Sequence, residues 1–179
     1  MKIKTKDLVA MAFLTAILLG GQVVMGFLPN IEIVSFLIIM YTLFYKKRVF
    51  YIIYVFALLE GLIYGFGIWW FMYLYVWSIL AIAVLIMRKN QSLIVWCILS
   101  GVFGLCFGAL CSIPYFISGG WAAGFGYWVT GIPFDIAHCA GNAVVMFVLY
   151  KPILAVLKRM TGERPLWETA KLKEKPVVS

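Results

Sequence analysis

The fold is decided by residues 49–87, VFYIIYVFALLEGLIYGFGIWWFMYLYVWSILAIAVLIM, which contain a single charged residue, Glu60. A membrane-spanning helix rises about 1.5 Å per residue and needs about 20 residues to cross a hydrocarbon core of about 30 Å. This apolar stretch is about twice that length, so the chain has to turn back within it. The sequence places the turn at Gly65-Phe66-Gly67 and predicts two successive spans, 49–66 and 68–87.

The rest of the chain is also strongly apolar and carries few charges. Hydrophobic residues make up 65% of the sequence, charged residues 12%, and the mean hydropathy is +1.02. A soluble domain of 179 residues would expose much of this apolar surface to water as large patches. Four further spans are predicted at 8–28, 31–45, 93–117 and 133–150, with a Gly- and Trp-containing loop before the last. We therefore expect an all-α membrane domain of six transmembrane helices over residues 1–160 and a polar cytoplasmic tail over 161–179.

The net charge of +8 is unevenly distributed. The Lys and Arg residues fall at 2–6, 46–48, 88–89 and 151–175, and none lies between these groups. Six crossings place all four groups on one side of the membrane, which the positive-inside rule identifies as the cytoplasm. We therefore expect both termini to be cytoplasmic. The same arrangement argues against a nucleic-acid-binding face.

Polar residues within the spans are few, and they fall in the half of the membrane opposite the basic groups. Ionisable side chains inside a bilayer cost about 2.5–3.5 kcal/mol on insertion scales, so they are candidates for function. The spacing of Asp135, His138 and Asn142 places them on one helical face. An outward-facing polar site is predicted from six residues: Gln22, Glu32, Glu60, Asp135, His138 and Asn142.

Each of these residues also has a structural interpretation. Glu60 could be a protonated, hydrogen-bonded structural group, and His138 a satisfied interior histidine. Asp135 could complement the dipole of its own helix. Glu32 is interpreted as a solvated charge at a loop end rather than a ligand-binding residue.

Aromatic residues are dense on the same outer side. Trp70, Tyr73 and Trp77 share a helical face, and Tyr64 ends the preceding predicted span. They predict a wall against which a planar ligand stacks. The alternative is the aromatic belt found at membrane interfaces.

Small residues form a stripe along the first span, at Ala12, Ala16 and Gly20. Similar pairs occur at Gly61/Gly65 and Gly104/Gly108. Small side chains let helices approach closely, either within one chain or between proteins.

Motifs for catalysis are absent from the sequence. It contains no Walker A loop, no GxSxG, no HExxH and no clustered metal ligands. The four cysteines lie in apolar segments without metal-ligand spacing. We expect no catalytic or metal-binding residues, no cofactor and no enzyme activity in this chain.

Three motifs, together with the length and topology, resemble the substrate-binding S components of energy-coupling factor (ECF-type) vitamin transporters. The first is the alanine signature Ala12-Phe13-Leu14-Thr15-Ala16, and the second is the Pro-x-Asp…Asn pattern within residues 131–142, GIPFDIAHCAGN. The third, Asn30-Ile31-Glu32, is most similar to the cobalamin-specific type. The resemblance covers nearly the whole chain up to about Met160.

This resemblance implies a prokaryotic plasma-membrane protein that captures a vitamin from outside, best matched to cobalamin (vitamin B12). Its implied partners are a transmembrane coupling subunit, contacted through Ala12, Ala16 and Gly20, and two ATPase subunits that bind ATP and magnesium. The chain would deliver its ligand by toppling on the coupling subunit. The substrate-binding residues expected are Asn30, Glu60, Tyr64, Trp70, Tyr73, Asp135, His138 and Asn142. Other micronutrients (a queuosine precursor, pantothenate or folate) remain alternatives, as do a stand-alone proton-coupled carrier and a purely structural subunit.

Overall fold

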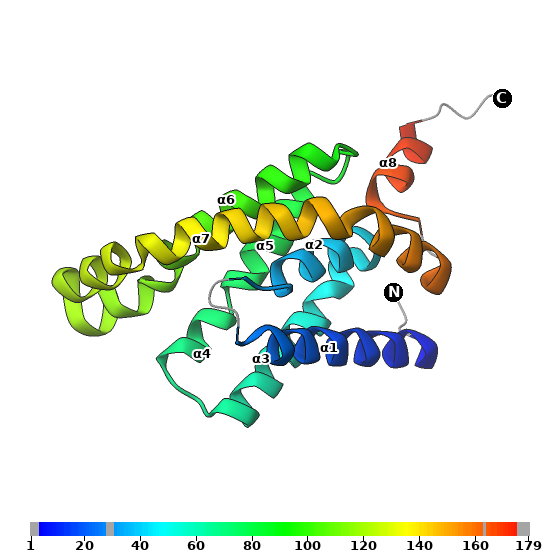
Figure 1. The fold of residues 1–179 in the computed structure, drawn as a ribbon. Helices are drawn as coiled ribbons and strands as arrows, with labels where there is room; N and C mark the ends of the chain where they lie inside the picture. Colours follow the sequence, from blue (N-terminus) through cyan, green and yellow to red (C-terminus); the bar gives the residue numbers. More distant parts are fainter. Residues whose placement is uncertain (1–3, 28–30, 163, 175–179) are drawn as a thin grey trace.

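The computed structural model describes residues 4–27, 31–162 and 164–174, and all regular secondary structure in these residues is helical (Figure 1). Helices satisfy their own backbone hydrogen bonds, which is the requirement that an apolar environment imposes. The elements are α1 (Thr5–Met25), α2 (Val34–Tyr45), α3 (Val49–Tyr64), α4 (Ile68–Tyr73), α5 (Val76–Ile86), α6 (Leu93–Cys111), α7 (Ile113–Thr161) and α8 (Leu166–Glu174), with a 3-10 turn at Lys46–Arg48.

Four helical segments of the described chain are long and apolar enough to cross a membrane. Of the remaining helices, α2 has 12 residues, α3 has 16 and α8 has 9. At about 1.5 Å per residue, α2 and α3 measure about 18 and 24 Å, less than a hydrocarbon core of about 30 Å. The four long segments are Thr5–Met25, Ile68–Ile86, Leu93–Cys111 and Ile113–Thr161. The predicted all-helical fold is therefore confirmed for the described residues, and four of its helical segments have the length and composition of membrane spans.

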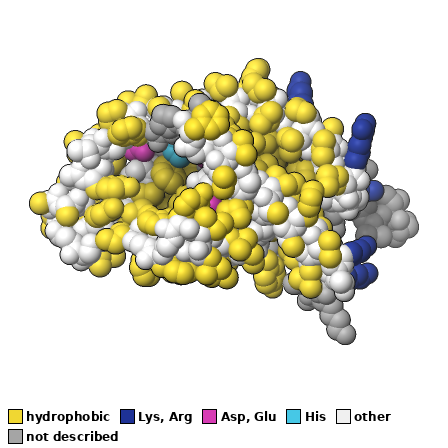
Figure 2. Space-filling view, turned by 60° about the horizontal axis from the view of Figure 1, so that its bottom comes forward, with side chains coloured by type: hydrophobic (Ala, Val, Ile, Leu, Met, Phe, Trp, Pro, Cys, Tyr) yellow, Lys and Arg dark blue, Asp and Glu magenta, His cyan; other side chains and the backbone are white. Residues whose placement is uncertain are grey.

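The short helix α2 is the centre of the fold. Every residue from Val34 to Phe44 is buried, and α2 contacts α1, α3, α5, α6, α7 and α8. A helix that is apolar on all sides is expected to lie inside a bundle. The surrounding helices bury one face against α2 and turn large apolar side chains outward (Figure 2).

The most extensive helix pair is formed by α6 and α7, which run side by side (Figure 1). A Cβ atom on Gly104 would lie 2.8 Å from the backbone oxygen of His138, and one on Gly108 would overlap the Asp135 carboxylate. Glycine is therefore required on this face of α6 for the two backbones to approach so closely. The predicted use of this pair of glycines in close packing is confirmed.

The predicted loop at residues 118–130 and the predicted helix start at Pro133 are wrong. Residues 121–161 form one continuous helix, which follows a break at Gly120 with φ of 74°. The chain doubles back at this break, because the Tyr115 and Tyr127 rings stack with centroids 4.3 Å apart. A backbone with φ in this range favours glycine. Residues 121–132 contain glycines and aromatic side chains typical of loops, but helical hydrogen bonding outweighs these weak preferences where water is scarce.

Two other boundaries differ from the predictions. The expected single helix over 68–87 is divided at Leu74 and Tyr75, where the Tyr75 hydroxyl donates a 2.7 Å hydrogen bond to the Leu110 carbonyl. The predicted polar tail over 161–179 contains a helix, α8, that packs against the rest of the chain. Leu166 and Trp167 are buried, and α8 contacts α2.

The basic side chains visible in Figure 2 gather at one end of a largely apolar surface. The helix order explains this arrangement. Lys46–Arg48 directly follow the end of α2, and α7 carries Lys158 and Arg159 in its last turn. α1 begins at the same end of the molecule (Figure 1).

Candidate ligand-binding site

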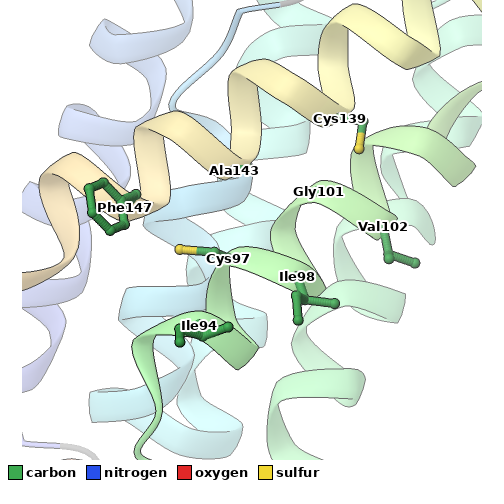
Figure 3. Close-up of a pocket in the computed structure, with 8 residues that line it drawn as sticks. All are labelled: Ile94, Cys97, Ile98, Gly101, Val102, Cys139, Ala143 and Phe147. Atoms are coloured by element: carbon green, nitrogen blue, oxygen red, sulfur yellow. The ribbon is translucent and has the colours of Figure 1, made fainter.

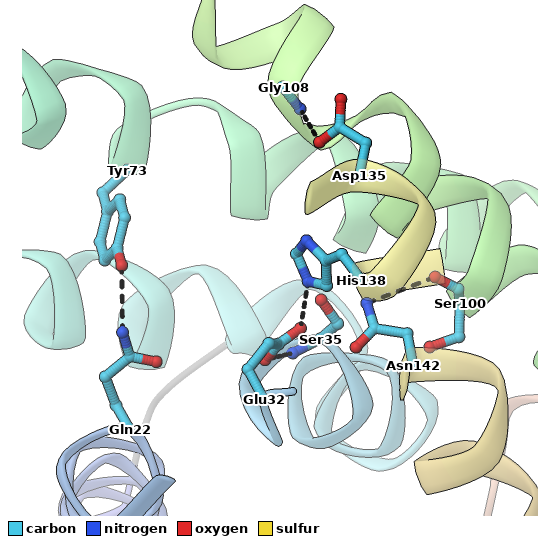
Figure 4. Close-up of polar contacts among 9 residues, drawn as sticks. All are labelled: Gln22, Glu32, Ser35, Tyr73, Ser100, Gly108, Asp135, His138 and Asn142. Carbon is cyan, nitrogen blue, oxygen red and sulfur yellow. Dashed lines mark hydrogen bonds and ion pairs between the residues drawn. The ribbon is translucent and has the colours of Figure 1, made fainter. Parts of the chain in front are cut away.

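A part-buried contact between a histidine and a glutamate joins α7 to the start of α2. The Nε2 atom of His138 lies 3.1 Å from Oε1 of Glu32, and the other Glu32 oxygen accepts a 2.8 Å hydrogen bond from the Ser35 backbone N–H (Figure 4). The two side chains are 6% and 15% exposed. The interpretation of Glu32 as a solvated charge is therefore wrong. The N-terminal amides of α2 hold one of its oxygens, and this leaves the other directed at His138.

The face of α7 that carries His138 also buries Asp135 and Asn142, as the spacing predicted. The Gly108 backbone N–H donates a 2.9 Å hydrogen bond to Oδ1 of Asp135 (Figure 4). The Asn142 amide donates a 3.4 Å hydrogen bond to the Ser100 carbonyl. Oδ2 of Asp135 and Oδ1 of Asn142 are buried and have no hydrogen-bond partner within the described chain.

A continuous row of aromatic rings extends from α3 to His138. The ring centroids of Phe56 and Tyr73 lie 6.0 Å apart, those of Tyr73 and Trp77 5.4 Å, and those of Trp77 and Phe107 5.6 Å. Phe107 ends the row at 4.9 Å from the His138 ring. These separations are typical of favourable aromatic contacts. Because the row draws on α3, α4, α5, α6 and α7, it fixes the relative positions of five helices.

Two further polar side chains meet this row. Gln22 of α1 donates a 3.2 Å hydrogen bond to the Tyr73 hydroxyl (Figure 4). Glu60 of α3 is 2% exposed, and one of its carboxyl oxygens has no hydrogen-bond partner in the described residues. Glu60 lies one helical turn after Phe56, the first ring of the row. Glu60, Tyr73, Glu32 and His138 therefore belong to one neighbourhood.

This neighbourhood lies away from the basic end of the molecule. Glu32 precedes the first residue of α2, whereas Lys46 follows its last. Figure 2 shows acidic and histidine side chains at a recess in the surface, separated from the gathered Lys and Arg side chains. The recess is where a ligand from outside the bundle can reach the buried polar groups.

Three of the expected substrate-binding residues are not part of this neighbourhood in the described structure: Tyr64, Trp70 and Asn30. Tyr64 is 55% exposed at the end of α3. Trp70 turns toward α3, where its indole N–H donates a 2.8 Å hydrogen bond to the Ala57 carbonyl, so the structure does not place it in the aromatic row. Asn30 lies outside the described residues.

Other members of the neighbourhood were not chosen from the sequence. Gln22 and Glu32 belong to the six polar residues of the predicted outer site, but they were not among the expected substrate-binding residues. Phe56 and Phe107 are two of 14 phenylalanines, and nothing in their local sequence distinguishes them from lipid-facing rings.

The small-residue stripe of α1 faces away from the bundle. Ala12, Ala16 and Gly20 are exposed, and a Cβ atom on Gly20 would meet nothing within 4 Å. The opposite face of α1 packs inward through Met11, Leu14, Thr15 and Leu18. The stripe is therefore not used for packing among the described helices.

An apolar groove lies between α6 and α7 on the outer surface (Figure 3). Its volume is about 450 Å³. The lining offers no charged, hydroxyl or amide side chain, so the groove is suited to an acyl chain rather than to a polar ligand. It is lined by Ile94, Cys97, Ile98, Gly101, Val102, Cys139, Ala143 and Phe147.

No family model matches the chain, and no curated protein or solved structure matches it either. The site is therefore interpreted from its own chemistry. The described residues contain no group of three or more His, Cys, Asp or Glu side chains placed to hold a metal ion. The neighbourhood offers the Glu32–His138 contact, several buried polar atoms without hydrogen-bond partners among the described residues and a row of aromatic rings, which together suit the binding of an organic ligand.

Proposed function

We propose that this chain is the substrate-binding subunit of an ATP-driven importer of the energy-coupling factor type. In this proposal the chain crosses the membrane six times, with α2 and α3 as short spans and α4 and α5 together as one. Both termini lie in the cytoplasm of a prokaryotic cell. The polar neighbourhood around Glu32 and His138 then opens to the outside and captures a micronutrient.

The contact between Glu32 and His138 is the main observation that supports this proposal. Enclosing a glutamate and a histidine side chain costs desolvation energy that their mutual contact often fails to offset, so the pair is weak evidence for stability. A role in ligand recognition explains the Glu32–His138 pair better than a role in stabilising the fold does. Its position supports an outward opening, because the pair lies at the start of α2 and the basic residues lie at the end.

The exposed stripe of α1 supports the proposed partners. Ala12 and Ala16 present a smooth surface on which a helix of a transmembrane coupling subunit can pack. Two ATPase subunits would supply the energy, and ATP and magnesium would bind to them. Delivery would follow when the chain topples against the coupling subunit.

Cobalamin is the ligand that the Asn30-Ile31-Glu32 motif favours by resemblance. A queuosine precursor, pantothenate and folate are the alternatives within the same role. Identifying the small molecule that co-purifies with the chain, by mass spectrometry, distinguishes these ligands directly.

Reconstituted uptake tests the proposed role. Proteoliposomes that contain the chain, the coupling subunit and both ATPases should accumulate ligand when ATP is present. Vesicles with the chain alone, or with ATPases inactivated in their Walker A lysines, should not. Undiminished uptake by the chain alone would refute the proposal.

A stand-alone proton-coupled carrier is the second candidate, favoured by the Glu32–His138 pair and the buried Glu60. Such groups can exchange protons as a ligand passes. This alternative predicts uptake that follows an imposed pH gradient in vesicles without any partner.

A further inference from the structure

The apolar groove between α6 and α7 shares no lining residue with the polar neighbourhood around Glu32 and His138 (Figure 3). The two helices touch at small residues, because a Cβ atom on Gly101 would lie 3.3 Å from the Cys139 carbonyl oxygen and 3.6 Å from the Ala143 Cβ atom. Larger apolar side chains that are at least half exposed stand on either side of this line of contact: Ile94, Ile98, Val102 and Phe147. The hollow therefore arises because the sequence places small residues between large ones.

The groove extends along about half the thickness of a membrane. Its lining spans residues 94–102 on α6 and 139–147 on α7, and each span covers eight helical steps. Eight steps rise about 12 Å, whereas one leaflet contributes about 15 Å to a hydrocarbon core of about 30 Å. The length of the groove therefore matches the acyl chain of a lipid in one leaflet.

Cationic side chains lie near one end of this groove. The two helices run antiparallel, as their successive contacts show: Gly101 on Cys139, Gly104 on His138 and Gly108 on Asp135. The start of α6 therefore lies beside the later part of α7. On α7 the groove is lined at every fourth residue, up to Phe147, and the next position on this face is Lys151. Lys151 is exposed, and so is Arg88 in the turn before α6.

The charge of these two side chains is not balanced within the described chain. The ion pairs at the basic end of the molecule are formed by other residues: Arg48 with Asp7, and Lys158 with Glu168. Neither Lys151 nor Arg88 forms an ion pair with any residue that the structure describes. Basic side chains beside a gap between membrane helices are typical of binding sites for anionic lipid headgroups. The apolar groove and the unbalanced charge therefore suit two parts of one lipid molecule.

We propose that the groove binds one anionic phospholipid, with an acyl chain along α6 and α7 and the phosphate at Lys151 and Arg88. The apolar lining excludes a polar ligand, and a zwitterionic lipid would not balance the two positive charges. The bound acyl chain would fill the hollow beside the helix pair that carries His138. This surface is separate from the proposed ligand site, so the inference does not depend on the importer role.

Lipid retention tests this inference. The full chain is released from nanodiscs that contain equal amounts of phosphatidylglycerol and phosphatidylcholine, and the lipids that stay bound are counted by native mass spectrometry. One phospholipid should remain bound per chain. Phosphatidylglycerol should exceed phosphatidylcholine about 25-fold, because each of the two basic residues contributes about fivefold in affinity. Equal retention of the two lipids, no retained lipid or a lipid-free dimer would overturn the inference.

Charge variants locate the headgroup. Lys151→Gln and Arg88→Gln should each lower the ratio of phosphatidylglycerol to phosphatidylcholine about fivefold. Lys47→Gln is the matched control, because it removes an exposed basic side chain at the same end of the molecule but between α2 and α3. This control should leave the ratio unchanged. An equal fall in all three variants would reveal a general attraction to the basic end and would contradict a defined headgroup site.

Two cysteine variants locate the acyl chain. Cys97 lines the groove, whereas Cys106 is exposed on the same helix outside it. A phenyl ring in Cys97→Phe occupies the groove and should lower retention of both lipids at least about tenfold, whereas Cys106→Phe should retain one lipid. Thermal unfolding confirms the fold of each variant, and the charge variants decide the question if Cys97→Phe does not fold. Equal retention by the two folded cysteine variants would contradict the proposed position of the acyl chain.

Discussion

Replacing Gly104 with alanine tests the contact that positions His138. The new Cβ atom would lie 2.8 Å from the His138 oxygen and 2.9 Å from its carbonyl carbon, both in the backbone of α7. Because a backbone cannot move aside as a side-chain tip can, α7 has to shift. Overpacking of this kind costs about 1–3 kcal/mol. The shift also moves the imidazole relative to Glu32, so we expect weaker ligand binding as well as lower stability.

Gly126→Ala is the matched control, since a Cβ atom on Gly126 would meet nothing within 4 Å. Both substitutions are in helices, so both gain about 1 kcal/mol of helix propensity. The difference between the two variants therefore isolates the overlap, at about 1–3 kcal/mol. The free energy of unfolding is measured by SDS titration in mixed micelles. Equal stability of the two variants would refute the close approach of α6 and α7.

Two further predictions concern the partner surface and the Glu32–His138 contact. Ala16→Trp should leave ligand binding by the isolated chain intact and abolish both assembly with the coupling subunit and uptake, because a large side chain blocks helix approach; lost binding would instead indicate internal packing. Glu32→Gln and His138→Gln should each destabilise the chain by about 1–3 kcal/mol, because each substitution disturbs a hydrogen bond between two largely buried polar groups. The double variant should cost less than the sum of the two, and strict additivity in the same SDS titration would contradict the contact.

The sequence predicted those features that depend on local periodicity. The i, i+3, i+7 spacing of Asp135, His138 and Asn142 determines that they share a face, and the structure buries all three. The spacing of Gly104 and Gly108 likewise indicated a close helix contact. For residues on the same helix, the regular geometry of that helix is sufficient to predict which side chains share a face.

Features that depend on distant residues could not be predicted. Glu32 and His138 are 106 residues apart, and a loop-end glutamate has no local signature that distinguishes pairing from solvation. The aromatic row joins single residues from five helices. These residues are far apart in the sequence, so no local sequence motif predicts the row. The long helix through residues 121–132 was missed because the Gly-rich composition indicates a loop in water, whereas an apolar environment favours internal hydrogen bonding.

The most direct test of the central claim, that the neighbourhood joined by Glu32 and His138 holds the ligand, is the amount of small molecule retained by the purified chain. Mass spectrometry of the chain in nanodiscs should detect a ligand in near-stoichiometric amount in the unmodified protein and in Glu168→Gln. The folded double variant Glu32→Gln/His138→Gln should retain little or none. Equal retention in all three proteins would contradict the assignment of the site.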